Sequence, residues 1–460
     1  MTKKKKILLL SDDLRMHSGI ATMSREIVLN SVKEFDWVQL GAALNHPENG
    51  KVFDLSVDTA KRTGVEDANV KVYCFNGYGN QEVLRELIQA ERPDAVLHFT
   101  DPRFWGWLYS MEHELRQMMP LMYYTIWDDT PYPMYNKQFY QSCDLLMCIS
   151  KQTHNIVKQV LKGAGYEDWQ ITYVPHGINH NDFFPITEEH EQWDEYNKFK
   201  DNVISKDTDF IVFHNARNIR RKHTSDLILA YKSFCDSLPK EKADKCLLLM
   251  HTEPIEEAGT DLTAVIKELC PMYKVRFTPS RIVTTKELNF YYNMADVTAN
   301  IASNEGFGLG TAESVMAGTP IVVNVTGGMQ DQCGFMKADG SYLTADDYSD
   351  EFQTNAEGTF TKCGIWANPV FPAVRTLQGS VATPYIFDDI ADYKETGAKL
   401  FDWYNMPREQ RKLCGVAGRE HYLKPEVGLS AESMGNNFIK DINTCFDKWQ
   451  PRKRTELVKV

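Results

Sequence analysis

Short apolar runs alternate with amphipathic segments along most of the chain. The runs at 7–10 and 94–99 have the length of buried strands, and the segment 20–32 spaces its apolar residues as a surface helix does. Repeated alternation of this kind predicts an α/β fold with parallel sheets covered by helices on both faces. In the first half, further strands are predicted at 38–41, 70–73, 121–126 and 145–149, and further helices at 81–90, 104–118 and 151–161.

The second half restarts the same rhythm after a polar, highly charged linker at 186–206. The segment 327–380, rich in Gly, Asp and Pro, is expected to be an irregular insertion. The aromatic residues of 104–118 are expected to serve the core rather than a sugar platform, and Asp207-Thr208-Asp209 is expected to be a polar turn rather than a metal site. Strands are predicted at 210–213, 246–250, 275–277, 297–302 and 321–325, and helices at 225–234, 261–269, 286–294, 314–317, 389–404, 407–422 and 431–449.

Composition narrows the class of protein. A chain of 460 residues can build two domains with substantial cores. The net charge of −12 argues against a nucleic-acid-binding surface as the main function. The ten cysteines are scattered without metal-type spacing, so we expect core thiols in a reducing, cytoplasmic setting, with neither disulfides nor structural zinc. The basic start at 3–6 is expected to lead into a strand, and no apolar run approaches the roughly 18 residues of a membrane helix.

A glycine-rich loop, Asn304 to Glu313, lies between two predicted strands and opens a predicted helix. Glycines allow close approach of the backbone to a ligand, and amides at a helix start favour an anion. Glu305 and Glu313 flank the loop eight residues apart, so a ligand with phosphate and hydroxyl groups, such as a nucleotide sugar, would suit it. A plain βαβ turn with no ligand remains the alternative on spacing alone.

Other candidate residues follow predicted strands. In a parallel sheet, ligands lie beyond the carboxyl ends of the strands. The basic cluster after 210–213 contains Arg217 and Lys222, and two such cations can hold a diphosphate and stabilise it as a leaving group. A solvated basic loop is the alternative for that cluster. Four further residues occupy strand ends: Gly19, Asp101, Asp128 and His176.

Taken in order, these motifs resemble the retaining glycosyltransferases of family 4. The specific part is the block from Glu305 to Glu313, followed by Ala317-Gly318-Thr319-Pro320, which resembles the E-x7-E region of that family. Arg217 and Lys222 resemble its Arg…Lys diphosphate pair. The segment 174–179, Val-Pro-His-Gly-Ile-Asn, resembles its interdomain motif, and Cys148-Ile149-Ser150 and Gly327-Gly328 also fit. The resemblance extends from about residue 7 to about residue 425.

The resemblance implies a GT-B architecture, in which two Rossmann-like domains face each other across a cleft. The domains would be 1–185 for the acceptor and 205–425 for the nucleotide sugar, and 426–460 would hold a helix crossing back to the first domain and a solvated basic tail at 451–454. Glu313 would bind the ribose, and Arg217 and Lys222 the diphosphate. The remaining donor contacts implied are Glu305, Phe307, Gly308 and Leu309 around the sugar, and Gly19 near the phosphates or the acceptor.

The same resemblance implies a hexosyl- or pentosyltransferase that uses UDP- or GDP-sugars, with retention by front-face attack. It implies no metal ion and no cofactor other than the nucleotide-diphosphate sugar as substrate. The family often has His-Asp or His-Thr where this chain has Trp127-Asp128, so Asp128 or Asp129 takes the histidine's place or the sugar pocket differs. His223 likewise stands where the family usually has Gly after the lysine.

Several questions stay open at this point. The acceptor could be a glycan, a lipid, a protein or a modified nucleic acid, and the sequence does not indicate an oligomeric state. The competing functions are a GT-B epimerase or phosphorylase, and a nucleotide-sugar-binding protein that has lost catalysis.

Overall fold

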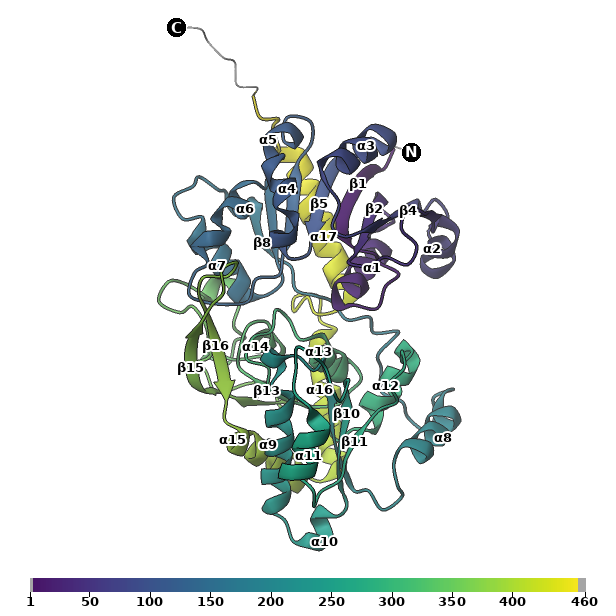
Figure 1. Cartoon of the computed structure of the whole chain (residues 1–460), viewed down its shortest axis with the longest axis vertical. Helices are drawn as coiled ribbons and strands as arrows, with labels where there is room; N and C mark the ends of the chain where they lie inside the picture. Colours follow the sequence, from purple (N-terminus) through teal and green to yellow (C-terminus); the bar gives the residue numbers. More distant parts are fainter. Residues whose placement is uncertain (1–2, 454–460) are drawn as a thin grey trace.

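The computed structural model describes residues 3–453 and shows two domains stacked along the long axis (Figure 1). The first domain is built on an eight-stranded sheet of order β3-β4-β2-β1-β5-β6-β7-β8. All neighbours in this sheet are parallel except β3 and β4, which pair antiparallel. Its strands are β1 (Lys5–Asp12), β2 (Phe35–Ala43), β3 (Val52–Asp54), β4 (Val70–Asn76), β5 (Ala95–Phe99), β6 (Leu121–Thr125), β7 (Leu145–Cys148) and β8 (Ile171–Tyr173).

The second domain is built on a six-stranded parallel sheet of order β11-β10-β9-β12-β13-β14. Counted from β9, this is the strand order 3-2-1-4-5-6 of a Rossmann fold, and the first sheet has the same order from β4 to β7, with β3 and β8 added at its two edges. Both sheets are therefore Rossmann-like, as the resemblance implied, and parallel, as the alternating pattern predicted apart from β3. The strands are β9 (Phe210–Asn215), β10 (Cys246–His251), β11 (Val275–Phe277), β12 (Val297–Asn300), β13 (Ile321–Asn324) and β14 (Ala367–Val370).

In the first domain, the helices predicted at 20–32, 81–90 and 151–161 are present, whereas the helices Ser56–Thr63 and Lys137–Gln141 were not predicted and the prediction for 104–118 is wrong. The segment 104–118 is not one helix, because a 3₁₀ turn at Pro102–Trp105 comes before two short helices that are separated at Met111. Gly106 weakens a continuous helix, and the packing of the buried Trp105 decides the path of the chain instead. The helices are α1 (Gly19–Ser31), α2 (Ser56–Thr63), α3 (Gln81–Glu91), α4 (Gly106–Ser110), α5 (Glu112–Leu115), α6 (Lys137–Gln141) and α7 (Lys151–Val160).

The helices that accompany the second sheet include one in the linker, α8, within the predicted 186–206. Asp207-Thr208-Asp209 lies in a turn between α8 and β9. The set comprises α8 (Trp193–Val203), α9 (Thr224–Asp236), α10 (Lys240–Ala243), α11 (Leu262–Leu269), α12 (Thr285–Met294), α13 (Leu309–Met316), α14 (Met329–Gln332), α15 (Tyr393–Asn405) and α16 (Arg408–Tyr422).

The expectation of an irregular insertion at 327–380 is wrong for its last part. This segment supplies the edge strand β14 and the first strand of a hairpin, β15 (Pro372–Gln378) paired antiparallel with β16 (Ile386–Ala391). The helix predicted from 389 accordingly begins only at Tyr393. Pro369 and Pro372 obscured the strands, since proline lacks the N–H that a central strand needs and is tolerated only at edges and strand starts.

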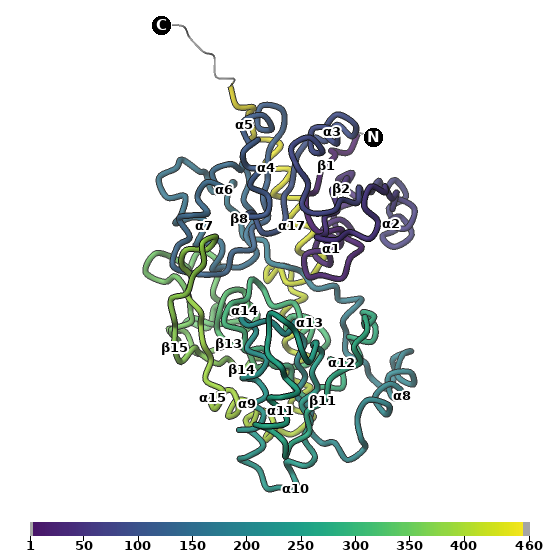
Figure 2. Tube along the Cα trace, viewed as in Figure 1, coloured from purple at the N-terminus to yellow at the C-terminus, as the bar shows by residue number. Residues whose placement is uncertain are grey.

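The C-terminal helix α17 (Ala431–Lys448) returns to the first domain, where it lies beside α1 (Figures 1 and 2). Its Phe438 ring meets Tyr124 of β6 edge to face, with centroids 4.8 Å apart. The chain passes between the domains twice, once near Ile178 and once just before α17, and these two segments are hydrogen-bonded to each other. The Ile178 amide donates to Leu429 O (2.9 Å), and the Ala431 amide donates to Ile178 O (3.0 Å). One apolar core therefore continues from one domain into the other.

Two composition-based expectations can be compared with the structure. Nine of the ten cysteines are buried, as expected for core residues. In the predicted basic tail, Arg452 pairs with Glu112 (2.9 Å) instead of extending into solvent, and Arg454 lies outside the described residues. Among residues 3–453, no helix is both long and apolar enough to cross a bilayer.

Candidate active site

A cavity of about 1480 Å³ lies between the two domains. Its walls come from the carboxyl ends of β5 and β6 and the start of α1 on one side, and from the loops after β9 and β12 on the other. All nine predicted site residues line it: Gly19, Asp128, Arg217, Lys222, Glu305, Phe307, Gly308, Leu309 and Glu313. Asp101 and His176, which sequence reasoning placed at strand ends, line it as well.

The glycine-rich loop places the start of a helix against the cavity. The helix expected at 314–317 in fact begins at Leu309, because Gly308 adopts a left-handed conformation (φ 88°) that starts it earlier. Glu313 thus lies within the helix, in its second turn. No side chain caps the helix, so the amides of its first turn are left for a ligand.

Lys222 and Glu305 form a nearly buried ion pair at this end of the cavity. The Lys222 ammonium contacts Glu305 Oε2 directly, and Arg221 lies 3.9 Å from the same oxygen while donating to Asn304 O (2.6 Å). Burial acts to raise the pKa of Glu305, but Lys222 and Arg221 outweigh it and hold that pKa below its usual value. Burial lowers the pKa of Lys222. The carboxylate is therefore ionised and firmly positioned.

Glu313 is held in a different environment. The Tyr292 hydroxyl of α12 donates to Glu313 Oε2 (2.7 Å) and accepts from Asn215 Nδ2 at the end of β9 (2.8 Å). Burial raises the pKa of Glu313 to about 7, although the Tyr292 hydrogen bond opposes the shift. The two glutamates of the loop consequently differ in charge near neutral pH.

Arg217 is paired with a different carboxylate from Lys222. Its guanidinium pairs with Glu256, and its side chain is 71% exposed. Although Arg217 lines the same cavity, the cation beside Lys222 and Glu305 is Arg221. The sequence named Arg217 by resemblance, whereas only the folded chain distinguishes the directions of the arginines in this cluster.

The loop also contacts the first domain. A Cβ on Gly306 would lie 3.1 Å from Ile149 Cδ1 and 3.2 Å from Ile126 O, so the absence of a side chain permits the close approach. Beside it, Asn304 Nδ2 donates to Asp129 Oδ1 (2.6 Å). Burial raises the pKa of Asp128 and raises that of its neighbour Asp129 well above the ordinary value. Two adjacent carboxyl groups at the end of β6 therefore carry less than their full charge.

Gly19 and His176 bring further parts of the first domain to the loop. Ser18 caps α1, accepting from the Ala21 amide (3.0 Å), and a Cβ on Gly19 would lie 3.1 Å from Leu309 Cδ1. The starts of α1 and α13 thus face each other across the cavity. His176 packs edge to face on Phe307 with centroids 5.2 Å apart, and burial lowers its pKa to about 3, which keeps the ring neutral.

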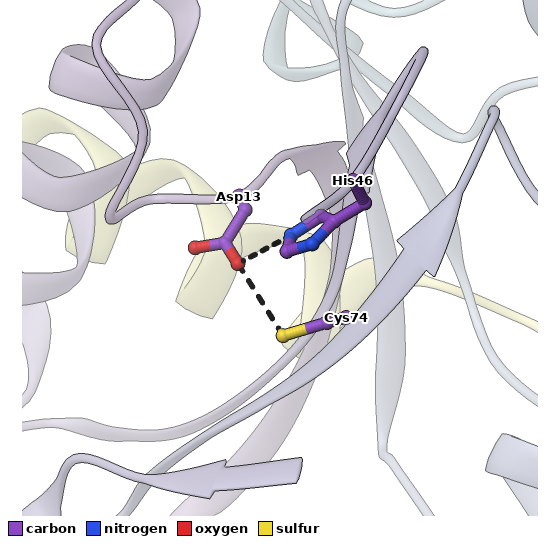
Figure 3. Close-up of side chains that lie close together, drawn as sticks. All are labelled: Asp13, His46 and Cys74. Atoms are coloured by element: carbon purple, nitrogen blue, oxygen red, sulfur yellow. Dashed lines mark hydrogen bonds and ion pairs between the residues drawn. The ribbon is translucent and has the colours of Figure 1, made fainter. Parts of the chain in front are cut away.

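A second polar cluster lies under the loop that leads into α1 (Figure 3). Asp13 Oδ2 accepts from His46 Nε2 (3.0 Å) and lies 3.6 Å from Cys74 Sγ. Ligand atoms of these three buried residues lie within 4.8 Å of one another, a spacing that could hold a metal ion. Arg15 Nη2 already reaches Asp13 Oδ2 (2.6 Å) and Cys74 Sγ (2.9 Å), so the protein's own cation occupies this position. We interpret the cluster as a support for the loop before Ser18.

Sequence reasoning missed several residues of the cavity. Asn304, which lines the cavity, carries no signal beyond its place beside Glu305. Tyr292, the hydrogen-bond partner of Glu313, is a buried residue of α12 and lies behind the cavity wall. The hairpin contributes Thr376, Gln378, Ser380 and Thr383, and the first three belong to the segment 327–380 that was expected to be irregular. Of these, only Asn304 could have been proposed from its position in the motif.

No protein-family model matches the chain. A curated relative, the alpha-monoglucosyldiacylglycerol synthase of Acholeplasma laidlawii, is 24% identical over 188 residues. That stretch is 41% of this chain and 43% of the relative, so less than half of either protein is matched.

Solved structures resemble the chain over nearly its whole length. Anabaena Alr3699/HepE in complex with UDP-glucose has a TM-score of 0.62 at 13% identity, covering 95% of this chain and 99% of that one. Sucrose-phosphate synthase from Thermosynechococcus elongatus has a TM-score of 0.62 at 14% identity, covering 96% and 100%. At such identities the likeness establishes the fold, and this chain has the GT-B fold of two facing Rossmann-like domains.

Proposed function

We propose that this protein is a retaining glycosyltransferase that moves a sugar from a nucleotide-diphosphate sugar to an acceptor hydroxyl. The observation that carries the proposal is the Lys222–Glu305 ion pair beside the uncapped start of α13, with Glu313 on the same helix. Together these groups offer cations and amides to a diphosphate and carboxylates to hydroxyls, which are the two chemistries of a nucleotide sugar.

Each part of the donor then has a partner. Glu313, oriented by Tyr292, accepts hydrogen bonds from the ribose hydroxyls. Lys222, Arg221 and the amides of α13 hold the diphosphate, and Arg217 joins them by leaving Glu256. Glu305, with the amides of Phe307 and Gly308, contacts the sugar. The cations supply the electrostatic stabilisation of the leaving diphosphate.

The donor is proposed to be UDP-glucose or another UDP-hexose. The Anabaena neighbour is described in complex with UDP-glucose, and the curated relative is named alpha-monoglucosyldiacylglycerol synthase. UDP-hexoses are therefore the first donors to test.

The proposed chemistry is front-face attack. The acceptor hydroxyl approaches the sugar C1 on the side from which the diphosphate leaves. The C1–O bond to phosphate breaks, the C1–O bond to the acceptor forms, and the acceptor proton passes to a phosphate oxygen. Asp128, opposite the Glu305 loop, would hold a hydroxyl of the sugar in place of the family's histidine.

Two measurements test this function. Thermal shift with UDP-glucose, UDP and a GDP-sugar reports donor binding, because a bound donor stabilises by mass action. UDP release with and without acceptor extracts reports turnover. We expect Lys222→Ala and Glu305→Ala each to lower turnover by at least about tenfold. Lys232→Ala, on an exposed helix pair with Asp236, is the matched control.

The outcomes separate the alternatives. Binding of UDP-glucose without any turnover would identify a binding protein that has lost catalysis. Wild-type rates in both site variants would refute the residue assignment even if the enzyme is active.

A further inference from the structure

We infer that the acceptor is an uncharged sugar or polyol hydroxyl, held on the first-domain wall of the cavity by Asp101, Arg103 and Trp127. This inference rests on the proposed function and names the substrate class that the transferred sugar reaches. The sequence singled out Asp101 for its strand-end position and Trp127 for standing where the family often has a histidine, and it assigned neither residue to an acceptor.

The three residues come together because β5 and β6 are adjacent parallel strands. His98 of β5 is in register with Tyr123 of β6, so the residues that follow each strand leave the sheet at the same edge. Asp101 and Arg103 follow β5, and Trp127 follows β6. All three line the cavity on the domain opposite to the Glu305 loop, where the acceptor must approach the donor sugar.

Asp101 and Arg103 form a fixed polar platform. Arg103 Nε donates to Asp101 Oδ1 (2.9 Å), and the Arg103 backbone amide donates to the same oxygen (3.0 Å). The guanidinium lies over the Trp127 ring at 5.8 Å, and the indole Nε1 donates to Asp129 O (2.9 Å), which fixes the ring. The Asp101 side chain remains 23% exposed and the Arg103 side chain 34% exposed, so a ligand can reach both the carboxylate and the guanidinium. A planar ion pair beside an aromatic ring offers donors, acceptors and an apolar face to a sugar.

The hairpin of the second domain completes this subsite. Thr383 contacts the Arg103 guanidinium through its hydroxyl, and the Phe387 amide donates to Thr130 O (2.8 Å), so β15–β16 is fixed against the first domain. The charged hairpin residue in the cavity lining, Asp388, is a carboxylate. Four other hairpin residues that line the cavity carry uncharged hydroxyl or amide groups: Thr376, Gln378, Ser380 and Thr383. Such groups recognise hydroxyls and give no stabilisation to a second charge.

Charge disfavours a phosphorylated acceptor. Among the described residues, the first-domain wall carries two guanidinium groups, and each already has a carboxyl neighbour: Arg25 lies 3.9 Å from Glu26, and Arg103 is paired with Asp101. Asp128 and Asp129 on the same wall carry less than their full charge, because burial raises the pKa of both. The opposite wall holds the cations Arg217, Arg220, Arg221 and Lys222. An acceptor phosphate on the first-domain wall would therefore find no unpaired cation among these residues, whereas a neutral hydroxyl would find acceptors for its proton.

One chemistry can come from two sources, a free saccharide or the sugar headgroup of a glycolipid. The test therefore supplies UDP-glucose and four acceptors: neutral mono- and disaccharides, the 6-phosphates of the same sugars, a detergent-dispersed monoglycosyl lipid, and an oligonucleotide with hydroxymethylated bases. UDP release above the water-only rate and the mass of the product are measured. We expect the free saccharide or the glycolipid to raise UDP release at least tenfold, and the sugar phosphates to raise it much less.

Variants test the platform itself. Asp101→Asn removes the charge and frees Arg103, so the ratio of kcat/KM for the neutral sugar to that for its phosphate should fall at least tenfold. A merely structural role for Asp101 would lower both values together. Thr383→Val, on the hairpin, should lower transfer relative to hydrolysis of the donor by water, and it keeps the test usable if Asp101→Asn fails to fold. Asp67→Asn, at an exposed pair with Lys4, is the control and should leave both ratios unchanged.

Results that contradict the acceptor inference can be told apart from results that contradict the proposed glycosyltransferase function. If UDP-glucose neither binds nor is hydrolysed, the glycosyltransferase proposal itself fails. If the donor binds and water hydrolyses it, a preference for the sugar phosphates or the oligonucleotide overturns the inference alone. A panel in which no neutral sugar exceeds the water rate overturns it as well.

Discussion

Donor binding should depend on pH through Glu313. Burial raises the pKa of this carboxyl to about 7, so in the folded protein it is protonated below that pH and ionised above it. An ionised carboxylate can accept hydrogen bonds from two ribose hydroxyls, whereas the protonated group loses one acceptor position and repels a hydroxyl that donates to it. The affinity for a UDP-sugar is therefore expected to fall as the pH decreases through 7.

The size of the effect follows from the ionised fraction. With a pKa of about 7, about three quarters of Glu313 is ionised at pH 7.5 and about 3% at pH 5.5. If only the ionised form binds, the apparent Kd rises about 25-fold between these values, which corresponds to about 2 kcal/mol. UDP-glucose is the suitable ligand because each of its phosphorus atoms carries one ester and one anhydride bond, so that neither has the second phosphate ionisation near pH 6.

Isothermal titration calorimetry at pH 5.5, 6.5 and 7.5 measures this Kd directly. Glu313→Gln preserves the shape of the side chain and cannot ionise, so its Kd should be weaker at pH 7.5 and should change less than threefold over the range. A wild-type Kd that stays constant from pH 7.5 to 5.5 would refute the reasoning. So would an equal pH dependence in Glu313→Gln, because another group would then be responsible.

Three further predictions concern the loop, the competing ion pair and the interdomain helix. Glu256→Gln should release the exposed Arg217 and tighten UDP binding by up to about fivefold, since exposed ion pairs contribute at most about 1 kcal/mol; weaker binding in calorimetry would contradict this. Gly308→Ala should lose about 1–2 kcal/mol of stability at its positive φ and also lose UDP affinity, whereas Gly340→Ala, equally left-handed but with no atom within 4 Å of its Cβ, should lose stability alone. Phe438→Ala should lower the free energy of unfolding in urea by about 3–5 kcal/mol, because a large cavity would open beside Tyr124. Asp447→Ala, exposed on the same helix, should stay within about 0.5 kcal/mol of wild type.

The sequence predicted the two-sheet fold well because buried parallel strands leave a strong local signal. The run 7–10 is apolar throughout and falls within β1, and the run 121–126, apolar apart from Thr125, covers β6 and one residue beyond it. The two failures have different causes. β14 contains a proline and is paired with β13, which is distant in the chain, whereas β15 pairs with the neighbouring β16 but has no buried run of apolar residues to mark it.

In the candidate site, too, the residues that could be predicted are those with a local sequence signal. The glutamate loop and Lys222 could be proposed because their spacing is local, and the structure places both at the cavity, while their roles stay predictions. The partner of Glu313 could not be proposed, because Tyr292 reaches it from another helix. The direction of Arg217 could not be proposed either, because a long flexible side chain chooses among partners, here Glu256, only once the chain is folded.

The return of α17 means that the first domain is not one continuous piece of chain. A fragment that ended near residue 185 would lack the helix that covers α1 and the ring of Tyr124. Such a fragment would expose the apolar face that α17 covers. That face could be covered again only by an α17 from another molecule. Separately produced halves of this protein would thus combine only if α17 were supplied to the first domain, although it follows the second domain in the sequence. The C-terminal helix, rather than the linker, therefore decides whether the two domains can be separated.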